Sequence, residues 1–352
     1  MSFPKVSFGE TLGRFVTPTI CNGCASCVVV YPYESLEYVD EAPRLTKECK
    51  SCGICAQICP KYNLSVPLLE QFTFGRERKE TEEFGVYRQI VIARTTNNDI
   101  RNVCQDGGIV TTLLTFALEN AIIDGAILSG LSEKEPLRAV PKLATNLREI
   151  MECAGTRYTY SPNILALKEG VQQRKKSVAF VGTPCHINAV RMAQKLPLKK
   201  YAGILSFTIG LFCSECFTYE GLVKRLIGEK MGIAPREVKK INVKGKMLIT
   251  TKAGETKTVS LKEAKEYARP CFSSCTDFSA ELADISAGGL GLNGWTLTLL
   301  RTQKGVDLFR KAESEGLIRT RPFNEEDAKI LEMLVKFSRM KHENLTKTVS
   351  HL

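Results

Sequence analysis

Histidine is scarce in this sequence, which has 352 residues but only three histidines, His186, His342 and His351. Two of the three lie within the last eleven residues. Enzymes that use a serine–histidine pair, or a zinc ion held by several histidines, need more of this residue than the chain offers. The scarcity therefore argues against both classes of enzyme.

Long apolar runs are missing as well. A nearly uncharged run such as Gly203 to Phe212 is far shorter than the roughly 20 residues that a membrane-spanning helix needs. The first fifteen residues, MSFPKVSFGETLGRF, lack the apolar stretch behind a basic start that marks a secretory signal. We therefore expect a cytoplasmic protein with reduced thiols. It should not span a membrane, although it can attach to the periphery of a membrane complex.

Cysteine, in contrast, is abundant: there are 14, and seven of them fall within the first 59 residues. These seven belong to two copies of the bacterial ferredoxin pattern, Cys-x-x-Cys-x-x-Cys, with a fourth cysteine before a proline. In that pattern three close thiolates bind one 4Fe-4S cluster, and the fourth cysteine binds the cluster of the other repeat. A zinc site on paired Cys-x-x-Cys motifs would not explain the third cysteine or the proline. The predicted ligands of the first cluster are Cys21, Cys24, Cys27 and Cys59.

The second cluster departs from the pattern. It keeps Cys49, Cys52 and Cys55, but its fourth ligand position is occupied by Tyr31. The cluster could be a 3Fe-4S cluster, recruit a ligand from elsewhere, use an oxygen ligand or be labile. Since reduction potentials follow cluster type, charge and hydrogen bonding, we expect the two N-terminal clusters to be inequivalent.

The chain organisation predicts a mixed α/β (α+β) protein in two parts. Residues 1–70 should form a small ferredoxin-like iron–sulfur domain, and residues 71–88, with their charged run and glycines, a linker. Residues 89–352 alternate between strand-like and helix-like segments, which is typical of a larger mixed α/β domain. Expected strands include 89–95, 126–130, 177–181 and 295–300, and expected helices 109–122, 184–195, 304–315 and 325–343.

The basic charge lies in the body of the chain. Residues 1–70 carry six Lys and Arg against seven Asp and Glu, so the whole excess behind the net charge of +11 falls on residues 71–352. A basic body suits an acidic ligand, but a solvated face that aids solubility gives the same composition. The basic residues form short clusters without interleaved aromatics, and no common nucleic-acid motif is present, so we expect no nucleic-acid partner.

Two glycine-containing turns could serve as sites in this body. Gly107 and Gly108 precede an expected helix, where backbone N–H groups can approach an anion, although a turn that caps a helix needs no ligand. Cys185 lies in the first helical turn after another such loop, where the helix dipole favours a thiolate. Later cysteines could converge with it on a third cluster, or simply be core residues. The Gly-x-Gly-x-x-Gly at residues 289–294 precedes an expected strand rather than a helix, which argues against a Rossmann site.

Five segments, in order, resemble the beta subunits of coenzyme F-420 hydrogenases and dehydrogenases. The resemblance covers about residues 86–320 and rests on these segments: 105–114 (QDGGIVTTLL), 154–162 (AGTRYTYSP), 181–189 (VGTPCHINA), 209–213 (IGLFC) and 275–286 (CTDFSAELADIS). Members of this family carry FAD and a 4Fe-4S cluster and exchange a hydride with the deazaflavin coenzyme. With its N-terminal two-cluster module, the chain looks most like the electron-input subunit of the archaeal F-420H2 dehydrogenase complex.

The resemblance implies further site residues. It makes a third cluster in the body the expectation, with Cys185, Cys213, Cys271 and Cys275 as ligands and Cys216 in reserve. It also implies that FAD contacts a set of small and hydroxyl residues: Gly107, Gly108, Thr111, Gly155, Thr156, Tyr158, Ser161, Gly182 and Thr183.

The implied activity is oxidation of reduced coenzyme F-420 by hydride transfer to FAD. Single electrons then pass through the clusters to an electron-accepting protein or to subunits of a membrane-associated complex. One alternative is a flavin and iron–sulfur reductase of the same family that acts on another substrate. The other alternative is an electron-transfer adaptor without an active site, which would lack flavin.

Overall fold

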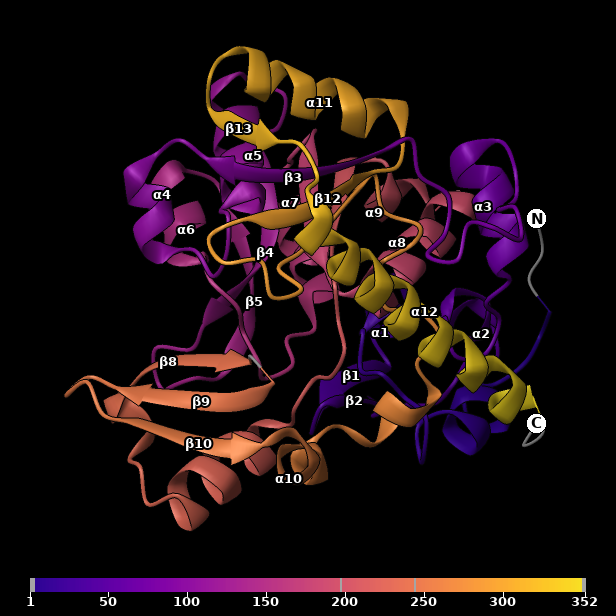
Figure 1. Cartoon of the computed structure of the whole chain (residues 1–352). Coiled ribbons are helices and arrows are strands. Elements are labelled where there is room, and N and C mark those ends of the chain that lie inside the picture. Colours follow the sequence, from indigo (N-terminus) through magenta and orange to yellow (C-terminus); the bar gives the residue numbers. More distant parts are fainter. Residues whose placement is uncertain (1–3, 197, 244, 350–352) are drawn as a thin grey trace.

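The protein is built around a mixed sheet, as Figure 1 shows for the computed structural model. The structure describes residues 4–196, 198–243 and 245–349, with side chains up to residue 344. Within these residues the sheet has eight strands in the order β13-β3-β12-β11-β7-β6-β4-β5. The neighbours β11, β7, β6 and β4 run parallel, and the outer pairs are antiparallel. The strands span β3 Gln89–Thr95, β4 Gly125–Leu131, β5 Ala139–Ala144, β6 Val178–Gly182, β7 Leu205–Leu211, β11 Ile285–Gly288, β12 Thr296–Leu300 and β13 Ile318–Arg321.

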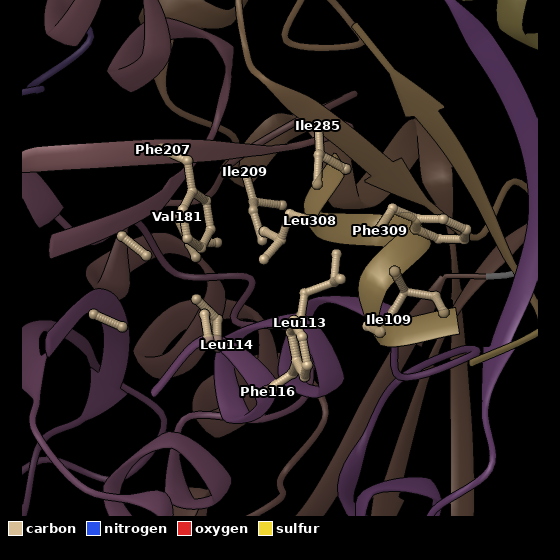
Figure 2. Packing of buried hydrophobic residues seen from close by; sticks show 14 of the residues in the cluster. Ile109, Leu113, Leu114, Phe116, Val181, Phe207, Ile209, Ile285, Leu308 and Phe309 are labelled. Atoms are coloured by element: carbon tan, nitrogen blue, oxygen red, sulfur yellow. The ribbon is translucent and has the colours of Figure 1, made fainter. Parts of the chain in front are cut away.

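Helices cover both faces of this sheet because its strands are apolar on both sides. Successive side chains of a strand point to opposite faces, so in β6 Val181 belongs to one core and Phe180 to the other. The first core packs against α5 (Ile109–Glu119) and α11 (Gln303–Ser314), through residues such as Leu113 and Phe309 (Figure 2). The second core packs against α7 (Ala166–Gln172) and α8 (Pro184–Lys195). The expected mixed α/β fold is confirmed.

The long C-terminal helix α12 (Ala328–Val349) crosses the front of the molecule in Figure 1. Its Leu334 packs with Leu297 and Leu299 of β12 in a core of its own. The expected helix at 325–343 is thus a short turn, η7 (Glu325–Asp327), followed by a helix that is longer than predicted.

The N-terminal module packs directly on the body. It consists of η1 (Gly9–Gly13), α1 (Ser26–Val30), β1 (Leu36–Val39), β2 (Ala42–Leu45) and α2 (Ile54–Ile58), and it has its own apolar core. That core includes Ala193 of α8, and Val29 of α1 in turn belongs to the second core of the body. The module is therefore joined to the face of the sheet that α8 covers.

A second small sheet was not expected from the sequence. Strands β8 (Val238–Val243), β9 (Lys246–Thr251) and β10 (Thr256–Ser260) form it, in the order β10-β9-β8. It shares a core with the helix η3 (Glu220–Lys230). The remaining helices are α4 (Asn98–Val103), α6 (Leu147–Glu152), η2 (Asn163–Leu165), α9 (Lys199–Ala202), η4 (Pro235–Glu237), α10 (Leu261–Ala264), η5 (Lys265–Tyr267) and η6 (Pro270–Ser274).

The segment 71–88, expected to be a linker, is instead packed into the fold. Helix α3 (Val66–Phe74) crosses the expected boundary at residue 70. Phe84 and Val86 are buried, and both of their carbonyl oxygens accept hydrogen bonds from the fully buried guanidinium of Arg301. The expectation of a linker was wrong because buried polar contacts of this kind leave no trace in local composition.

Arg78 in this segment connects two parts of the chain that are far apart in sequence. Its guanidinium lies 2.5 Å from the Glu70 carboxylate and 2.6 Å from that of Glu281. Both carboxylates are almost fully buried. Removing one partner of a buried ion pair is costly, because the remaining charge has neither water nor a counter-ion.

We expect Arg78→Met to lower the free energy of unfolding by about 3 kcal/mol. The matched control is Arg76→Met, which removes the more exposed ion pair with Glu82 and should cost less than about 1 kcal/mol. Urea unfolding of both variants checks this. Equal losses of unfolding free energy in the two variants would show that the buried ion pair contributes no more to stability than the exposed one.

Candidate functional site

The two cysteine motifs have closely matching backbones. Helices α1 and α2 follow residues with left-handed backbone, Ala25 (φ 63°) and Gly53 (φ 72°). They end at Tyr31 (φ −68°, ψ 119°) and Cys59 (φ −78°, ψ 118°). Tyr31 and Cys59 therefore occupy equivalent positions in the two repeats.

The four thiols predicted for the first cluster converge in the N-terminal module. Burial, together with the neighbouring Cys59, raises the pKa of Cys24 to about 12. Burial and the nearby Cys24 likewise raise the pKa of Cys27 well above its usual value. Buried thiols that repel one another as thiolates suit a cationic metal centre, since metal ligands must be deprotonated. The backbone N–H of Gly23 also donates to Cys21 Sγ at 3.4 Å, which is the kind of hydrogen bond that tunes an iron–sulfur cluster.

The second cluster site is closer to the surface. Cys49 and Cys52 are half-buried, and Cys49 Sγ accepts hydrogen bonds from the N–H groups of Phe8 at 3.3 Å and Ser51 at 3.4 Å. Burial alone would raise the pKa of Cys49, but these hydrogen bonds bring it below its usual value. The hydroxyl of Tyr31 lies 3.9 Å from the same sulfur.

A single metal ion finds no comparable site in the described part of the chain, where no three His, Cys, Asp or Glu side chains are placed to hold one. A 4Fe-4S cluster has a different requirement. It carries iron at four separate corners, so its thiolates surround a volume rather than a point.

A third set of cysteines lines one cavity of about 60 Å³ in the body. Cys185 comes from the first turn of α8, Cys213 and Cys216 lie in the loop after β7, Cys271 lies in η6 and Cys275 directly follows it. All four predicted ligands and the reserve are brought together: Cys185, Cys213, Cys216, Cys271 and Cys275. Five thiols therefore line the cavity, whereas a 4Fe-4S cluster needs four cysteine ligands.

The polar groups around this cavity also favour an occupant. Twelve buried side-chain atoms lack a hydrogen-bond partner in the described structure, and four of them belong to residues that line this cavity: Asn22 Nδ2, Asn188 Oδ1, Arg269 Nε and Asp277 Oδ1. A buried polar atom left unsatisfied costs about 1–3 kcal/mol. The two donors among them, Asn22 Nδ2 and Arg269 Nε, could donate to the inorganic sulfides or thiolates of an iron–sulfur cluster, whereas the two acceptor oxygens, on Asn188 and Asp277, would need another partner.

One of the five thiols differs from the rest. Burial raises the pKa of Cys185 and of Cys216 to about 12. The pKa of Cys275 is instead lowered to about 5, because the Cys271 side chain donates to it and Lys61, Lys341 and Arg269 surround it with positive charge. Those cations offset part of the negative charge that several thiolates would bring.

The cavity adjoins the first cluster site. Asn22, next to Cys21, and Pro60 and Lys61, which follow Cys59, line it together with the later cysteines. Lys61 Nζ donates to the Ser274 carbonyl at 2.5 Å and to its hydroxyl at 3.0 Å. Cys27 of the first site interacts with Cys55 of the second site, and no cysteine of the second site lines the cavity. The first cluster site therefore connects the second site to the cavity, and the three sulfur sites form a row.

Arg269 bridges the module and the body at this junction. Its guanidinium forms an ion pair with the Glu41 carboxylate and donates to the Glu41 carbonyl at 3.0 Å. It lies over the ring of Tyr160, 4.4 Å from the centroid. The Tyr160 hydroxyl is 3.0 Å from His186 Nε2, and burial lowers the pKa of His186 to about 3. Sequence reasoning missed Arg269, although its position two residues before Cys271 was a usable indication.

The first group of residues expected to bind FAD lies at the start of α5. Gly108 opens the helix with φ 76°. Gly107 is confined between strands, because a Cβ there would lie 2.5 Å from the Ala93 carbonyl and 2.7 Å from the backbone nitrogen of Thr296. Thr111 is buried in the same helix. Packing therefore explains Gly107 without a ligand, while the first turn of α5 retains N–H groups suited to an anion.

The second group, from residue 155 onward, adjoins the first. A Cβ on Gly155 would lie 3.3 Å from the Val103 carbonyl, just before the α5 loop. Burial and the nearby Asp106 charge raise the pKa of Tyr158 to about 12. The buried Arg157 Nε is unpartnered in the described structure, and a cation suits the diphosphate of FAD. Thr156 is exposed next to it. The structure thus brings Gly155 and the residues after it beside the start of α5, while both Nη atoms of Arg157 donate to backbone carbonyl oxygens.

The other expected FAD residues lie elsewhere. Thr183 caps α8 and its Oγ1 is 3.2 Å from Cys185 Sγ, so it belongs to the cysteine cavity. Gly182 packs against His186. Ser161 donates to Asn163 Oδ1 at 2.6 Å inside the core. A second cavity of about 550 Å³, which includes Lys199 and Lys304, contains none of the expected FAD residues.

Comparison with protein-family models matches residues 90–168 and 175–326 to the N-terminal and C-terminal parts of the coenzyme F-420 hydrogenase/dehydrogenase beta subunit. The chain belongs to this family. The resemblance inferred from the five sequence segments is thereby confirmed.

Hydrogenase beta subunits are among the relatives of this chain. Coenzyme F-420 hydrogenase subunit beta of Methanosarcina barkeri is 37% identical over 275 residues, which cover 77% of this chain and 94% of the relative. A chain of the solved F-420-reducing nickel–iron hydrogenase complex from the same species matches with a TM-score of 0.73 and 35% identity. That match covers 78% of this chain and 95% of the solved chain.

Two other relatives match a longer part of this beta-subunit-type chain. An F-420H2 dehydrogenase subunit of Methanosarcina mazei is 28% identical over 320 residues, 86% of this chain and 85% of the relative. The coenzyme F-420-dependent sulfite reductase of Methanocaldococcus jannaschii is 32% identical over 323 residues, 87% of this chain and 48% of the relative. These shares exceed what residues 89–352 alone could supply, so both matches extend into the first 88 residues.

Every helix in the described residues is too short or too polar to cross a bilayer.

The tight loop of the first cluster site gives a test of the junction with the body. A Cβ on Gly23 would lie 2.7 Å from Arg269 Nη2 and 2.8 Å from the Glu41 carbonyl. We expect Gly23→Ala to cost about 3 kcal/mol, from left-handed strain plus overpacking. Gly75→Ala has the same backbone (φ 74°) but open space, so it should cost only about 1 kcal/mol. Anaerobic urea unfolding distinguishes them, and equal effects would contradict the crowded junction.

Proposed function

We propose that this chain oxidises reduced coenzyme F-420 by hydride transfer to FAD, and that single electrons then pass through iron–sulfur clusters to a partner protein. One observation carries the proposal: the cysteine cavity of the body directly adjoins the first cluster site of the N-terminal module. Membership of the family supports the coenzyme, and the two cysteine motifs support an electron route that extends the family domain.

The proposal assigns distinct tasks to the residues. FAD, when bound, supplies the chemistry that converts a two-electron hydride donor into a source of single electrons. The start of α5, with Gly107 and Gly108, and the neighbouring Gly155 to Tyr158 would hold its polar groups through backbone N–H groups and the Arg157 guanidinium. The cysteines of the cavity would hold the inner cluster. No histidine is required as an acid or base.

The electron route follows from the row of sulfur sites. Lys61 and Arg269 lie between the cavity and the first cluster site, where positive charge stabilises added electrons on either side. The half-buried second site then lies at the outer end. A partner protein, whether a subunit of a membrane-associated complex or another acceptor, would take up electrons there.

An alternative is favoured by the match to the coenzyme F-420-dependent sulfite reductase, of which this chain spans 48%. In that case the same sites would supply electrons to a reductase of the same family acting on another substrate. A bare electron-transfer adaptor is the remaining alternative, and it would contain no flavin.

The deciding experiment is an anaerobic purification with measurement of flavin, iron and sulfide, followed by an assay of reduced coenzyme F-420 with a viologen dye as acceptor. We expect bound FAD and dye reduction that depends on the coenzyme. Iron–sulfur content without flavin would favour the adaptor, and loss of both flavin and turnover would overturn the proposal. Flavin with turnover of a different donor only would favour the other reductase.

The inner cluster has its own test. Cys185→Ser should remove the iron of one cluster and abolish electron transfer from the coenzyme to the dye, while the N-terminal clusters persist in the EPR spectrum. Cys153→Ser is the matched control, because Cys153 is a half-buried thiol that does not line the cavity, and it should leave the iron content unchanged. Unchanged iron in Cys185→Ser would remove that residue from the ligand set.

A further inference from the structure

Tyr31 stands where the fourth ligand of the second cluster would be expected. Its backbone angles at the end of α1 differ by at most about 10° from those of Cys59 at the end of α2. Cys59 points into the first cluster site, where it interacts with Cys21 and Cys24. The same geometry in the other repeat directs Tyr31 into the second cluster site, as the crossed ligand pattern requires.

The phenol is held at this place by several contacts. Its hydroxyl donates toward Cys49 Sγ at 3.9 Å and accepts the backbone N–H of Lys50 at 3.3 Å. Its ring packs edge-on against Tyr33, with centroids 5.7 Å apart. Only 4% of the residue is exposed. A side chain this constrained is part of the site rather than a group that swings aside for another ligand.

The shape of the side chain decides what it can do. A phenol reaches farther from the backbone than a thiol, so its ring fills the space in which a cysteine sulfur and the iron bound to it would lie. Its hydroxyl donates a hydrogen bond to a neighbouring cysteine, which is the role of a donor and not of an iron ligand. The size of the ring and the direction of its hydrogen bond therefore both argue against a fourth iron atom at this position.

We propose that the side chain of Tyr31 occupies the space of the fourth iron atom and its thiolate ligand. The second cluster is then a three-iron, four-sulfide cluster held by Cys49, Cys52 and Cys55. The inference builds on the electron-transfer role proposed above and specifies its outer end. A hydrogen bond from Tyr31 to one of the three remaining ligands favours the electron-rich state of the cluster. The second cluster then has the highest reduction potential of the three, and the partner protein accepts electrons from it.

Spectroscopy of the anaerobically purified full chain tests this directly. An oxidised three-iron cluster is paramagnetic and an oxidised four-iron cluster is not, so the oxidised wild type should show the EPR signal of one three-iron cluster per chain. Reconstitution with excess ferrous iron and sulfide separates a built-in cluster from a damaged one. The three-iron signal should survive this treatment in the wild type. Its conversion into a second four-iron cluster would overturn the proposal.

Three substitutions sharpen the test. Tyr31→Cys restores the thiolate, so after reconstitution it should lose the three-iron signal and gain one iron per chain by Mössbauer spectroscopy. Tyr31→Phe keeps the ring without the hydroxyl, so it should keep the three-iron signal at a lower midpoint potential. Tyr33→Phe, the matched control on the exposed neighbour, should change neither property. A four-iron cluster in Tyr31→Phe would show that the hydroxyl, and not the ring, excludes the fourth iron, and would contradict the steric basis.

These measurements do not use coenzyme F-420 or flavin. A chain with the three-iron signal but no coenzyme oxidation would contradict the proposed function and leave the inference intact. A chain that oxidises the coenzyme but holds two four-iron clusters in its N-terminal module would contradict the inference about Tyr31 and leave the proposed function intact. If Tyr31→Cys does not fold, reconstitution of the wild type still decides.

Discussion

The buried guanidinium of Arg269 holds together the two halves on which every proposed step depends. It is anchored to Glu41 of the N-terminal module, and its own backbone N–H donates to the Cys216 carbonyl at 2.9 Å. Burial opposes its charge, but the surrounding tyrosines, thiols and Glu41 keep the pKa of Arg269 above its usual value. Because a charge this deep must keep its partner, the module cannot move away from the cavity without a large free-energy cost. A fixed separation between redox sites is what an electron route needs.

A second set of buried charges holds the sheet side of the same junction. Arg301 donates to Ser286, Ser279 and two carbonyl oxygens of the segment after α3. Arg191 of α8 pairs with Asp284 at 3.0 Å. Both interactions fix the chain between Cys275 and β11, while Cys185 is fixed on α8. Buried polar contacts, in addition to apolar packing, therefore hold the segments that form the cavity in place.

Local sequence patterns were sufficient for the parts of the molecule that depend on neighbours in sequence. Apolar runs predicted β3, β4, β6 and β12, and the glycine and proline positions predicted the starts of α5 and α8. The cysteine repeat predicted that Cys59 would lie beside Cys24 and Cys27, because the ferredoxin pattern fixes this crossing between its two repeats. The convergence of Cys213 and Cys275 with Cys185 needed the family resemblance, since it depends on which strands become neighbours. Thr183 was grouped with the flavin residues because sequence could not show that the first turn of α8 places it beside Cys185.

The position of α12 has a consequence for how the protein is assembled during synthesis. Lys341, near the end of this helix, lines the cysteine cavity and lies over the Phe272 ring at 3.8 Å. All the cysteines of the two N-terminal motifs are present once the first 59 residues have left the ribosome, whereas Lys341 in the wall of the cavity follows 282 residues after Cys59. For the proposed iron–sulfur clusters, this sets an order of insertion. The outer sites can be loaded on the growing chain, and the inner site closes only after α12 has been added.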